Sequence, residues 1–354
     1  MRAVVVDGVR ARPEVREVPD PAPPAGGVVV RVGATGLCRS DWHAWAGHDD
    51  LAYPHVPGHE LAGEVVAVGA GVRSWGVGDR VTVPFVCGCG RCVWCRAGDA
   101  QVCPDQQQPG FTHWDSYAGA GPCRVGPAGP ELVALHAADT NLVAVPEGVD
   151  DDTAASLGCR FATAFRGLTS RADVREGEWV SVVGAGGVGL SSVMIARALG
   201  ARVVAVDRHP GALELARSLG AEHTVLAEPG ADIPAALADL TGGGAHVSVD
   251  AVGSEQTLTD AVLGLRRRGR HVQVGLLPHD LTVVPLARAV AWELDLLGSH
   301  GMAASDYPPM LAMVSDVRLR PDLLVDRTVD LDEAAALLPH LDSAVTAGMV
   351  VAVP

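Results

Sequence analysis

Residues 179–207 run as Trp179-Val-Ser-Val-Val, then Gly184-Ala-Gly186-Gly187-Val188-Gly189, then a helical segment through Leu199 and the run Arg202-Val-Val-Ala-Val-Asp207. An apolar run, a glycine-rich turn, a helix and a second apolar run predict one parallel βαβ unit. The backbone N–H groups of such a turn, together with the helix dipole, can hold a pyrophosphate. Asp207 ends the second strand, where a carboxylate can bind ribose hydroxyls. These residues therefore predict a dinucleotide site.

The glycines have a second interpretation, in which they only allow the helix to pack closely on the sheet. That role explains one glycine but not three together with Asp207. Because a carboxylate at Asp207 would repel a 2′-phosphate, we expect NAD rather than NADP, while Arg208 beside it keeps NADP open. The uncharged run Trp179–Ala196 approaches the length of a membrane span, but its central glycines favour a tight turn instead.

Further βα alternation follows this unit. We predict helices over Gly211–Leu219 and Gln256–Leu265, and strands over His246–Asp250 and from His271 onward. Asp151-Asp-Thr opens the first helix of the region, with acids where the helix dipole favours negative charge. The alternation predicts a doubly wound α/β domain, of the Rossmann type, over residues 151–296.

The chain before residue 151 has a different character. Short β-branched runs separated by Gly, Pro and Asp predict a barrel-like all-β domain. The Pro-rich stretch Val18–Pro24 and most of Gln101–Pro130 are predicted to be irregular. Because the run Gly348–Val353 resembles the early strands, we expect residues 297–354 to return to this first domain, which otherwise comprises residues 1–150.

Composition and charge exclude several function classes. A chain of 354 residues exceeds what one hydrophobic core usually supports, which agrees with two domains. The formal charge of −15 and a pI near 5.2 repel phosphate backbones and anionic lipid head groups. We therefore expect neither nucleic acid nor a membrane as a partner. The sequence starts directly in a strand-like run without signal-peptide features, so the expected location is cytoplasmic.

Four cysteines are spaced as metal ligands. Cys89, Cys92, Cys95 and Cys103 follow the pattern Cys-x2-Cys-x2-Cys-x7-Cys in a Gly-rich stretch. Four close thiolates make a closed tetrahedral zinc site, which would brace a lobe of about residues 86–104 rather than react. Disulfides are the alternative, disfavoured in a reducing compartment. Cys87 could replace Cys89 with poorer geometry, and Cys87 and Cys123 are interpreted as spare thiols.

A dispersed set of motifs resembles the zinc-dependent medium-chain alcohol dehydrogenase family of bacterial type. These motifs, in matching order, are Cys38-Arg39-Ser40-Asp41, Gly58-His59-Glu60-x2-Gly63, the four-cysteine lobe, Cys159 and the glycine turn. The resemblance covers essentially the whole chain. It implies a GroES-like catalytic domain split by the Rossmann domain, with the active site between them.

The resemblance also assigns roles to individual residues. Cys38, His59 and Cys159 would hold a catalytic zinc, with Glu60 behind it as an exchanging or supporting ligand and the fourth position open, giving two zinc ions per chain. Ser40 would take the proton of the alcohol and His43 would pass it to solvent by way of the ribose. The residues expected to contact the cofactor are Arg39, the turn Gly184–Gly189, Asp207, Arg208, Val252 and Gly275. Since Gly348-Met-Val lacks a basic residue that some relatives have, Arg39 would meet the phosphates alone.

Simpler interpretations stand beside several of these roles. Ser40 could cap a helix that starts at Asp41, and His43 could be a solvated helix residue. Phe85 and Trp114 match positions that wall the substrate pocket in the family, but they could also be ordinary core aromatics.

The resemblance implies reversible hydride transfer between NAD and a primary or secondary alcohol, forming an aldehyde or ketone. A dehydrogenase dedicated to a polyol, a terpene alcohol or a pathway intermediate is the enzymatic alternative, because the same zinc chemistry serves all of them. A catalytically dead NAD-binding sensor or structural subunit is the alternative from another class. By resemblance to bacterial relatives we expect a homo-oligomer, a tetramer before a dimer.

Overall fold

A computed structural model describes residues 1–111, 131–277, 283–342 and 348–354. The chain divides into two compact units. Unit 1 comprises Met1–Ala162, Gly301–Ser315 and Pro321–Pro354, and unit 2 comprises Thr163–His300 and Asp316–Arg320. Segments from both ends of the chain therefore combine into one unit, and most of the second unit comes from the sequence between them.

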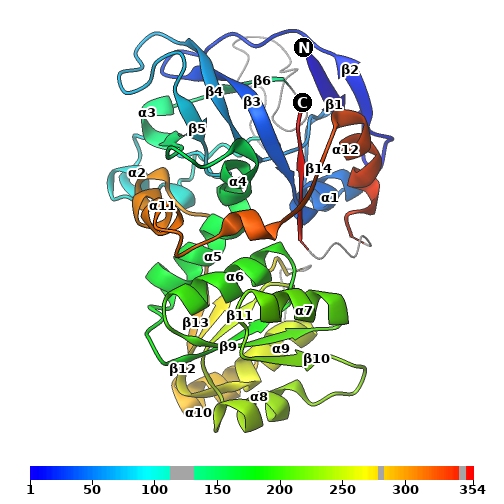
Figure 1. Cartoon of the computed structure of the whole chain (residues 1–354), viewed down its shortest axis with the longest axis vertical. Helices are drawn as coiled ribbons and strands as arrows, with labels where there is room; N and C mark the ends of the chain where they lie inside the picture. The colour runs from blue at the N-terminus through cyan, green and yellow to red at the C-terminus, as the bar shows by residue number, and fades with distance from the viewer. Residues whose placement is uncertain (112–130, 278–282, 343–347) are drawn as a thin grey trace. The chain divides into compact units, whose positions relative to one another are not determined.

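Unit 1 is built on β-strands (Figure 1). The strands are β1 (Arg2–Val5), β2 (Glu14–Glu17), β3 (Val28–Leu37), β4 (Glu60–Val68), β5 (Arg80–Thr82), β6 (Leu132–Leu135), β7 (Val143–Ala144), β14 (Val325–Val329) and β15 (Met349–Ala352). The helices are α1 (Arg39–Ala46), α2 (Val93–Arg96), α3 (Ala138–Asn141), α4 (Asp151–Ser156), α11 (Tyr307–Ser315) and α12 (Leu331–Leu337). β1 pairs with β2, and the other strands form one sheet in the order β14-β15-β3-β4-β5-β7, with β6 also paired to β3.

Alternating apolar residues of β3 and β4 supply the core of unit 1. Val28, Val30 and Val32 of β3 are buried together with Leu61 and Val65 of β4, as expected of antiparallel strands with one face turned inward. The C-terminal strand β15 pairs antiparallel with β3, opposite Thr35–Leu37. The expected return of the chain end to the first domain is thus a strand pairing.

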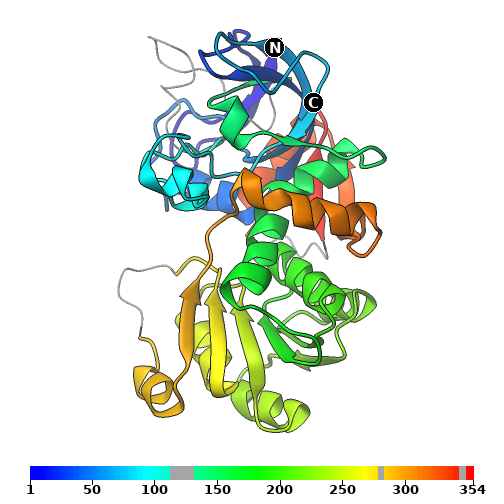
Figure 2. The same ribbon diagram turned by 90° about the vertical axis from the view of Figure 1, so that its left-hand side faces the viewer.

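Unit 2 contains a six-stranded sheet in which every pairing is parallel. Its strands are β8 (Trp179–Val183), β9 (Arg202–Asp207), β10 (His223–Leu226), β11 (Ala245–Asp250), β12 (Leu265–Gln273) and β13 (Asp295–Gly298), in the order β10-β9-β8-β11-β12-β13. Its helices are α6 (Gly187–Ala198), α7 (Pro210–Ser218), α8 (Ile233–Thr241), α9 (Glu255–Leu263) and α10 (Leu286–Trp292), while α5 (Ala162–Arg166) starts at the unit boundary. Figure 2 shows the strands side by side. The strand order reverses between β8 and β11, which is where such sheets bind nucleotides.

The unit boundaries differ from the predicted positions of residues 150/151 and 296/297. The observed units divide after Ala162 and after His300. The helix that opens at Asp151, α4, was assigned to the Rossmann domain, but it packs on β3 and β4 and so lies in unit 1. Similarly, α9 ends at Leu263, and Leu265 already begins β12, which therefore starts well before the predicted His271.

The uncharged run from Trp179 to Ala196 folds as β8, a turn and most of α6. Within the described residues, no helix has the length and apolar character required to span a membrane.

Candidate metal centres and nucleotide site

A first cluster of metal-ligand side chains lies in unit 1. The ligand atoms of Cys38, His59, Glu60 and Cys159 all lie within 4.8 Å of one another. Cys38 follows β3 and His59 precedes β4, and the register that places Gly36 opposite Glu60 brings these two segments together. Cys159 comes from a π-helical turn, Leu157–Phe161, a local widening of the helix that is frequent at functional sites. Three segments far apart in the sequence thus bring four residues together.

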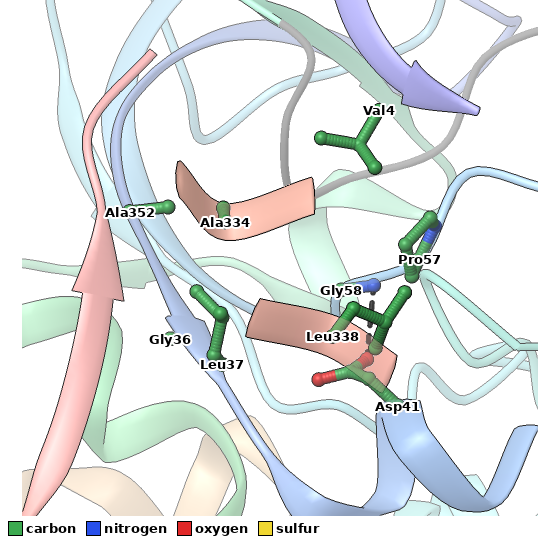
Figure 3. Close-up of a pocket in the computed structure, with 9 residues that line it drawn as sticks. All are labelled: Val4, Gly36, Leu37, Asp41, Pro57, Gly58, Ala334, Leu338 and Ala352. Carbon is green, nitrogen blue, oxygen red and sulfur yellow. Dashed lines mark hydrogen bonds between the residues drawn. The ribbon is translucent and has the colours of Figure 1, made fainter. Parts of the chain in front are cut away.

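Asp41 orients the imidazole of His59. Its Oδ1 accepts a hydrogen bond from the backbone N–H of Gly58 at 3.0 Å (Figure 3). The same oxygen accepts from Nδ1 of His59 at 3.0 Å, and Oδ2 accepts from the N–H of Cys38 at 2.9 Å. Burial alone would lower the pKa of His59, but the Asp41 carboxylate raises it well above its ordinary value. The Nε2 atom is buried and has no nitrogen or oxygen partner within the described part of the chain. A carboxylate behind a histidine with a free Nε2 is the arrangement of a metal ligand.

Glu60 is held by Arg160, which directly follows Cys159. The side chain of Arg160 donates through Nε to both oxygens of Glu60, at 2.9 and 3.1 Å, and through a terminal nitrogen to Oε2. The backbone N–H of Arg160 adds a bond of 3.1 Å to Oε1. Glu60 is 0 % exposed and Arg160 is 7 % exposed, so this is a buried ion pair. It holds the Glu60 carboxylate beside the ligand atoms and neutralises its charge.

The donor set fits zinc. Two thiol sulfurs and one imidazole nitrogen, with a position left for water or substrate, are the ligands of a catalytic zinc site. Hydrogen bonding to Cys159 lowers the pKa of Cys38 well below its usual range, against the effect of burial, and His59 and Arg160 lower it further. Cys38 is therefore prepared to bind as a thiolate, the form that coordinates metals.

The residues of the expected proton relay lie on α1. This helix begins at Arg39, with Cys38 as its N-cap, so the alternative in which Ser40 caps a helix from Asp41 is wrong. The Ser40 hydroxyl lies 3.7 Å from the sulfur of Cys38. His43 is half-buried, and Arg39 is exposed at the first position of the helix. Ser40 is thus next to a candidate metal ligand.

Two aromatic rings lie beside the imidazole of His59. Phe85 and Phe111 lie edge-on to His59, with ring centroids 5.9 and 4.9 Å from it. Phe85 was predicted as a pocket wall, whereas Phe111 carries no sequence signal and was missed. Trp114, the other predicted wall, lies outside the described residues.

Figure 3 shows a pocket that Asp41 lines together with largely apolar residues such as Val4, Leu37 and Leu338. The proposed zinc ligands do not line it. The oxygens of Asp41 are already engaged by three donors. The pocket therefore offers no free polar group from the described residues to orient a substrate.

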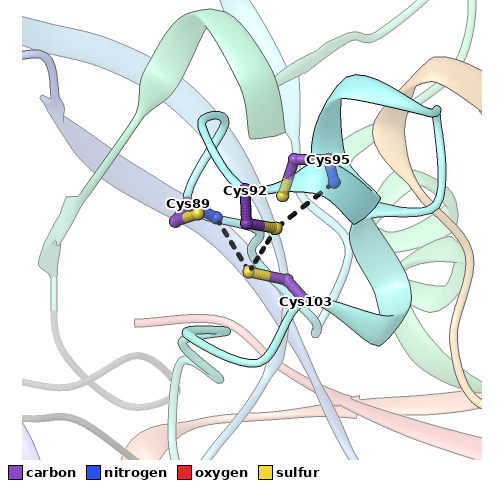
Figure 4. Close-up of side chains that lie close together, drawn as sticks. All are labelled: Cys89, Cys92, Cys95 and Cys103. Carbon is purple, nitrogen blue, oxygen red and sulfur yellow. Dashed lines mark hydrogen bonds between the residues drawn. The ribbon is translucent and has the colours of Figure 1, made fainter.

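The four cysteines of the predicted lobe also converge (Figure 4). The sulfur atoms of Cys89, Cys92, Cys95 and Cys103 lie within 4.8 Å of one another. Backbone N–H groups donate to two of them, from Cys89 to the sulfur of Cys103 and from Cys95 to the sulfur of Cys92, both at 3.4 Å. Such bonds stabilise thiolates, and the set fits a closed tetrahedral zinc site.

Cys87 is separate from this cluster. It is buried, its thiol donates to the carbonyl of Pro84 at 3.5 Å, and burial raises its pKa to about 12. A thiol with so high a pKa is neither a good ligand nor reactive at neutral pH. The structure thus separates Cys87 from Cys89, as interpreted from the sequence, while Cys123 lies outside the described residues.

Three glycines of the turn in unit 2 have different structural roles. Gly184 has φ +94°, a left-handed conformation that only glycine adopts readily in a tight turn. A Cβ on Gly189 would collide with the carbonyl of Gly184, so this residue allows the helix to pack on the strand. A Cβ on Gly186 would meet nothing within 4 Å. Packing alone therefore does not explain Gly186, whose open surface fits the approach of a pyrophosphate.

Asp207 and the loops beyond the strand ends surround this turn. Asp207 accepts hydrogen bonds from the N–H groups of Ala185, at 2.6 Å, and His209, at 2.8 Å. Arg208 is exposed next to it. Gly187 and Val188 form the first turn of α6, where N–H groups are free of intrahelical partners.

Val252 and Gly275 follow β11 and β12, and both are linked to Asp250. The side chain of Asp250 accepts from the N–H of Val252 at 2.9 Å, and its carbonyl accepts from the N–H of Gly275 at 2.9 Å. Asp250 is fully buried and also bonds to Thr257 and Gln273. Asp250, Asp41 and Arg160 were not predicted to have a role, although each lies within or beside a recognised motif.

Comparisons with known proteins show the family of this chain. The family model described as alcohol dehydrogenase GroES-like domain matches residues 24–147, and the model described as zinc-binding dehydrogenase matches residues 187–316. A probable zinc-binding alcohol dehydrogenase of Mycobacterium tuberculosis is 36% identical over 95% of this chain and 84% of its own length.

Solved structures show the same likeness. Alcohol dehydrogenase from Thermus sp. ATN1 superimposes with a TM-score of 0.88 at 31% identity, covering 100% of this chain and 99% of that one. An NAD-dependent alcohol dehydrogenase superimposes with a TM-score of 0.86 at 31% identity, covering 100% of both chains. With a GroES-like unit, a Rossmann-type unit and these relatives, the chain belongs to the zinc-dependent medium-chain alcohol dehydrogenase family.

Proposed function

We propose that this oxidoreductase transfers hydride reversibly between NAD and a primary or secondary alcohol, forming an aldehyde or ketone. The observation that carries the proposal is the buried cluster of Cys38, His59 and Cys159, in which Asp41 holds Nδ1 of His59 while Nε2 has no nitrogen or oxygen partner in the described residues. Zinc bound there would lower the pKa of the alcohol and stabilise its deprotonated form. NAD would accept the hydride.

The side chains of unit 1 would prepare the alcohol for this step. Asp41 holds the His59 ring and the backbone of Cys38 in fixed positions. Ser40, whose hydroxyl is 3.7 Å from the sulfur of Cys38, accepts the alcohol proton, and His43 passes it on. The rings of Phe85 and Phe111 exclude water from one side of the site.

Unit 2 would bind the cofactor through its glycine turn. The pyrophosphate would lie over Gly186 at the start of α6, and Asp207 would bind the ribose hydroxyls. The carboxylate of Asp207 and the NAD dependence of a similar structure support NAD over NADP. The substitution Asp207→Ser should lower kcat/KM for NAD and raise kcat/KM for NADP. An unchanged ratio would contradict this assignment.

Zinc content together with turnover tests the proposal. Wild type should contain two zinc ions per chain, and Cys159→Ala should contain one and lose activity. Cys103→Ala is the matched variant, because it removes a ligand of the other cluster. NADH formation over a panel of alcohols would identify the substrate class. An active wild type with one zinc or none would contradict the mechanism.

We also propose a homo-oligomer, a tetramer before a dimer, in the cytoplasm. β13 is an edge strand of the six-stranded sheet, with Leu296 39% exposed, and Val290 of the preceding helix is 79% exposed. Exposed apolar residues beside an unpaired edge favour association. Light scattering coupled to size-exclusion chromatography measures the assembly.

The proposed location in the cytoplasm rests on the cysteines. Those that the structure describes are free thiols, as in a reducing compartment.

A further inference from the structure

The C-terminal end of α1 brings a second histidine against His43. Gly47 takes a left-handed conformation with φ 85°, and the N–H of His48 donates to the carbonyl of His43 at 3.0 Å. The chain therefore folds back, and the Nδ1 atoms of the two histidines lie 3.0 Å apart. A Cβ on Gly47 would crowd the side chain of Val9. The turn that presents His48 thus requires glycine.

The two imidazole rings are held in place by a neighbour. Trp42 lies edge-on to both, with ring centroids 5.3 Å from His43 and 5.4 Å from His48. Because two Nδ1 atoms at hydrogen-bond distance require one donor and one acceptor, the tautomers of the pair are coupled. Because Nδ1 of His43 faces His48, Nε2 is the atom of His43 that would bind the ribose hydroxyl in the proposed relay. His43 is half-buried, whereas His48 is exposed.

We propose that His48 is the last member of the proton relay, receiving the proton from His43 and releasing it to water. This inference rests on the proposed function. His43 takes a proton at Nε2 and gives the proton on its Nδ1 to Nδ1 of His48. His48 then loses the proton on its own Nε2 to solvent. Only protons move in these steps. Proton exchange with water then restores the starting tautomer of each histidine before the next turnover.

The charges around the pair suit this transfer. Burial lowers the pKa of His43, and the positive charges of His48 and Arg39 lower it further, while Asp49 and Cys38 oppose them. The short helix Leu338–His340, which packs against α1, adds the titratable His340. A neutral His43 can receive a proton at neutral pH and pass it on at once.

The test compares zinc-loaded His48→Gln with His223→Gln, a histidine of unit 2 that stacks on Trp179. Glutamine keeps a hydrogen-bonding group, but its amide cannot accept a proton from His43 and release another to water. We expect kcat for alcohol oxidation to fall about tenfold, most strongly at low pH, which is less than the roughly 10²–10⁴-fold of a group that takes the proton directly from the reacting atom. KM for NAD and for the alcohol should stay unchanged, and added imidazole should restore kcat. His223→Gln should behave as wild type.

Nitrogen-15 spectra of the imidazoles provide a readout that does not depend on turnover. In wild type the spectra should show a coupling between the two Nδ1 atoms across their hydrogen bond, and in His48→Gln the pKa of His43 should rise because the charge of His48 no longer lowers it. A wild-type pH profile in His48→Gln, or no coupling between the two Nδ1 atoms in wild type, would overturn the relay role of His48. A wild type that binds zinc but oxidises no alcohol would instead overturn the proposed function, while the spectra would still test the pair.

Discussion

Replacing Arg160→Met should destabilise unit 1 by about 3 kcal/mol. The change leaves Glu60, which is 0 % exposed, without three hydrogen bonds from the guanidinium and without a counter-charge. Removing one partner of a buried ion pair costs about 3–5 kcal/mol. The backbone N–H of residue 160 still donates to Oε1, so the lower end of that range applies. In a unit of roughly 150–250 residues, this corresponds to a fall in Tm of about 6–12 °C.

The loss should depend on pH. Burial already raises the pKa of Glu60, against the charge of Arg160, and losing that charge raises it further. A carboxyl group whose pKa is higher in the folded than in the unfolded state stabilises the fold when protonated and loses this contribution as pH rises. Arg160→Met should therefore be closer to wild type near pH 5 than near pH 8.

Scanning calorimetry measures these shifts in Tm. The scans are run with and without bound zinc, because zinc could bind the Glu60 carboxylate once Arg160 no longer holds it. Arg31→Met is the matched control, because Arg31 of β3 pairs at 3.0 Å with Glu64 of β4, the strand that also carries Glu60, but this pair is exposed. Exposed pairs contribute at most about 1 kcal/mol. The double variant Arg160→Met, Glu60→Leu should recover most of the loss. A shift at pH 8 no larger than that of the control would refute the reasoning.

Three further predictions concern other residues. Asp41→Asn keeps the shape but removes the charge behind His59, so the affinity of the catalytic zinc should fall about 10–100-fold with the other zinc retained, as measured by chelator competition; equal loss of both ions would contradict this. Gly189→Ala should lower Tm because its Cβ meets the Gly184 carbonyl, whereas Gly186→Ala should keep Tm and weaken NADH binding measured by fluorescence titration. The reverse pattern would exclude the assigned roles. Burial lowers the pKa of His55 from 6.5 to about 3. Between these values the unfolded chain holds a proton that the folded chain does not, so stability should fall as pH drops, by up to about 1.4 kcal/mol per unit. In His55→Gln this slope, measured by urea unfolding, should be smaller, and an unchanged slope would count against the assignment.

Local patterns predicted much of unit 2. The run from Trp179 to Asp207 folds as β8, α6 and β9, because an apolar strand, a glycine turn and a helix are each encoded by neighbouring residues. The prediction was wrong where one local pattern is compatible with either unit. The helix that begins at Asp151 is locally an ordinary capped helix, and only its packing on β3 and β4 places it in unit 1.

The motifs likewise indicated the candidate metal ligands but not the residues that orient them. The spacing of Cys89, Cys92, Cys95 and Cys103 indicates one site by itself, because the loop that carries them is short. Asp41 contacts His59 across 18 positions of the chain, and Arg160 contacts Glu60 across 100. A hydrogen bond over such a separation leaves no periodic pattern in the sequence.

The sequence by itself thus determined the two-domain organisation, the glycine turn and the candidate zinc ligands, because each depends on residue type at close spacing. The tertiary structure alone decided which residues orient those ligands, where the units divide and that His48 meets His43. These features depend on strand register, as between Gly36 and Glu60, and on how a capped helix end returns on itself. Such contacts form only when the chain has folded.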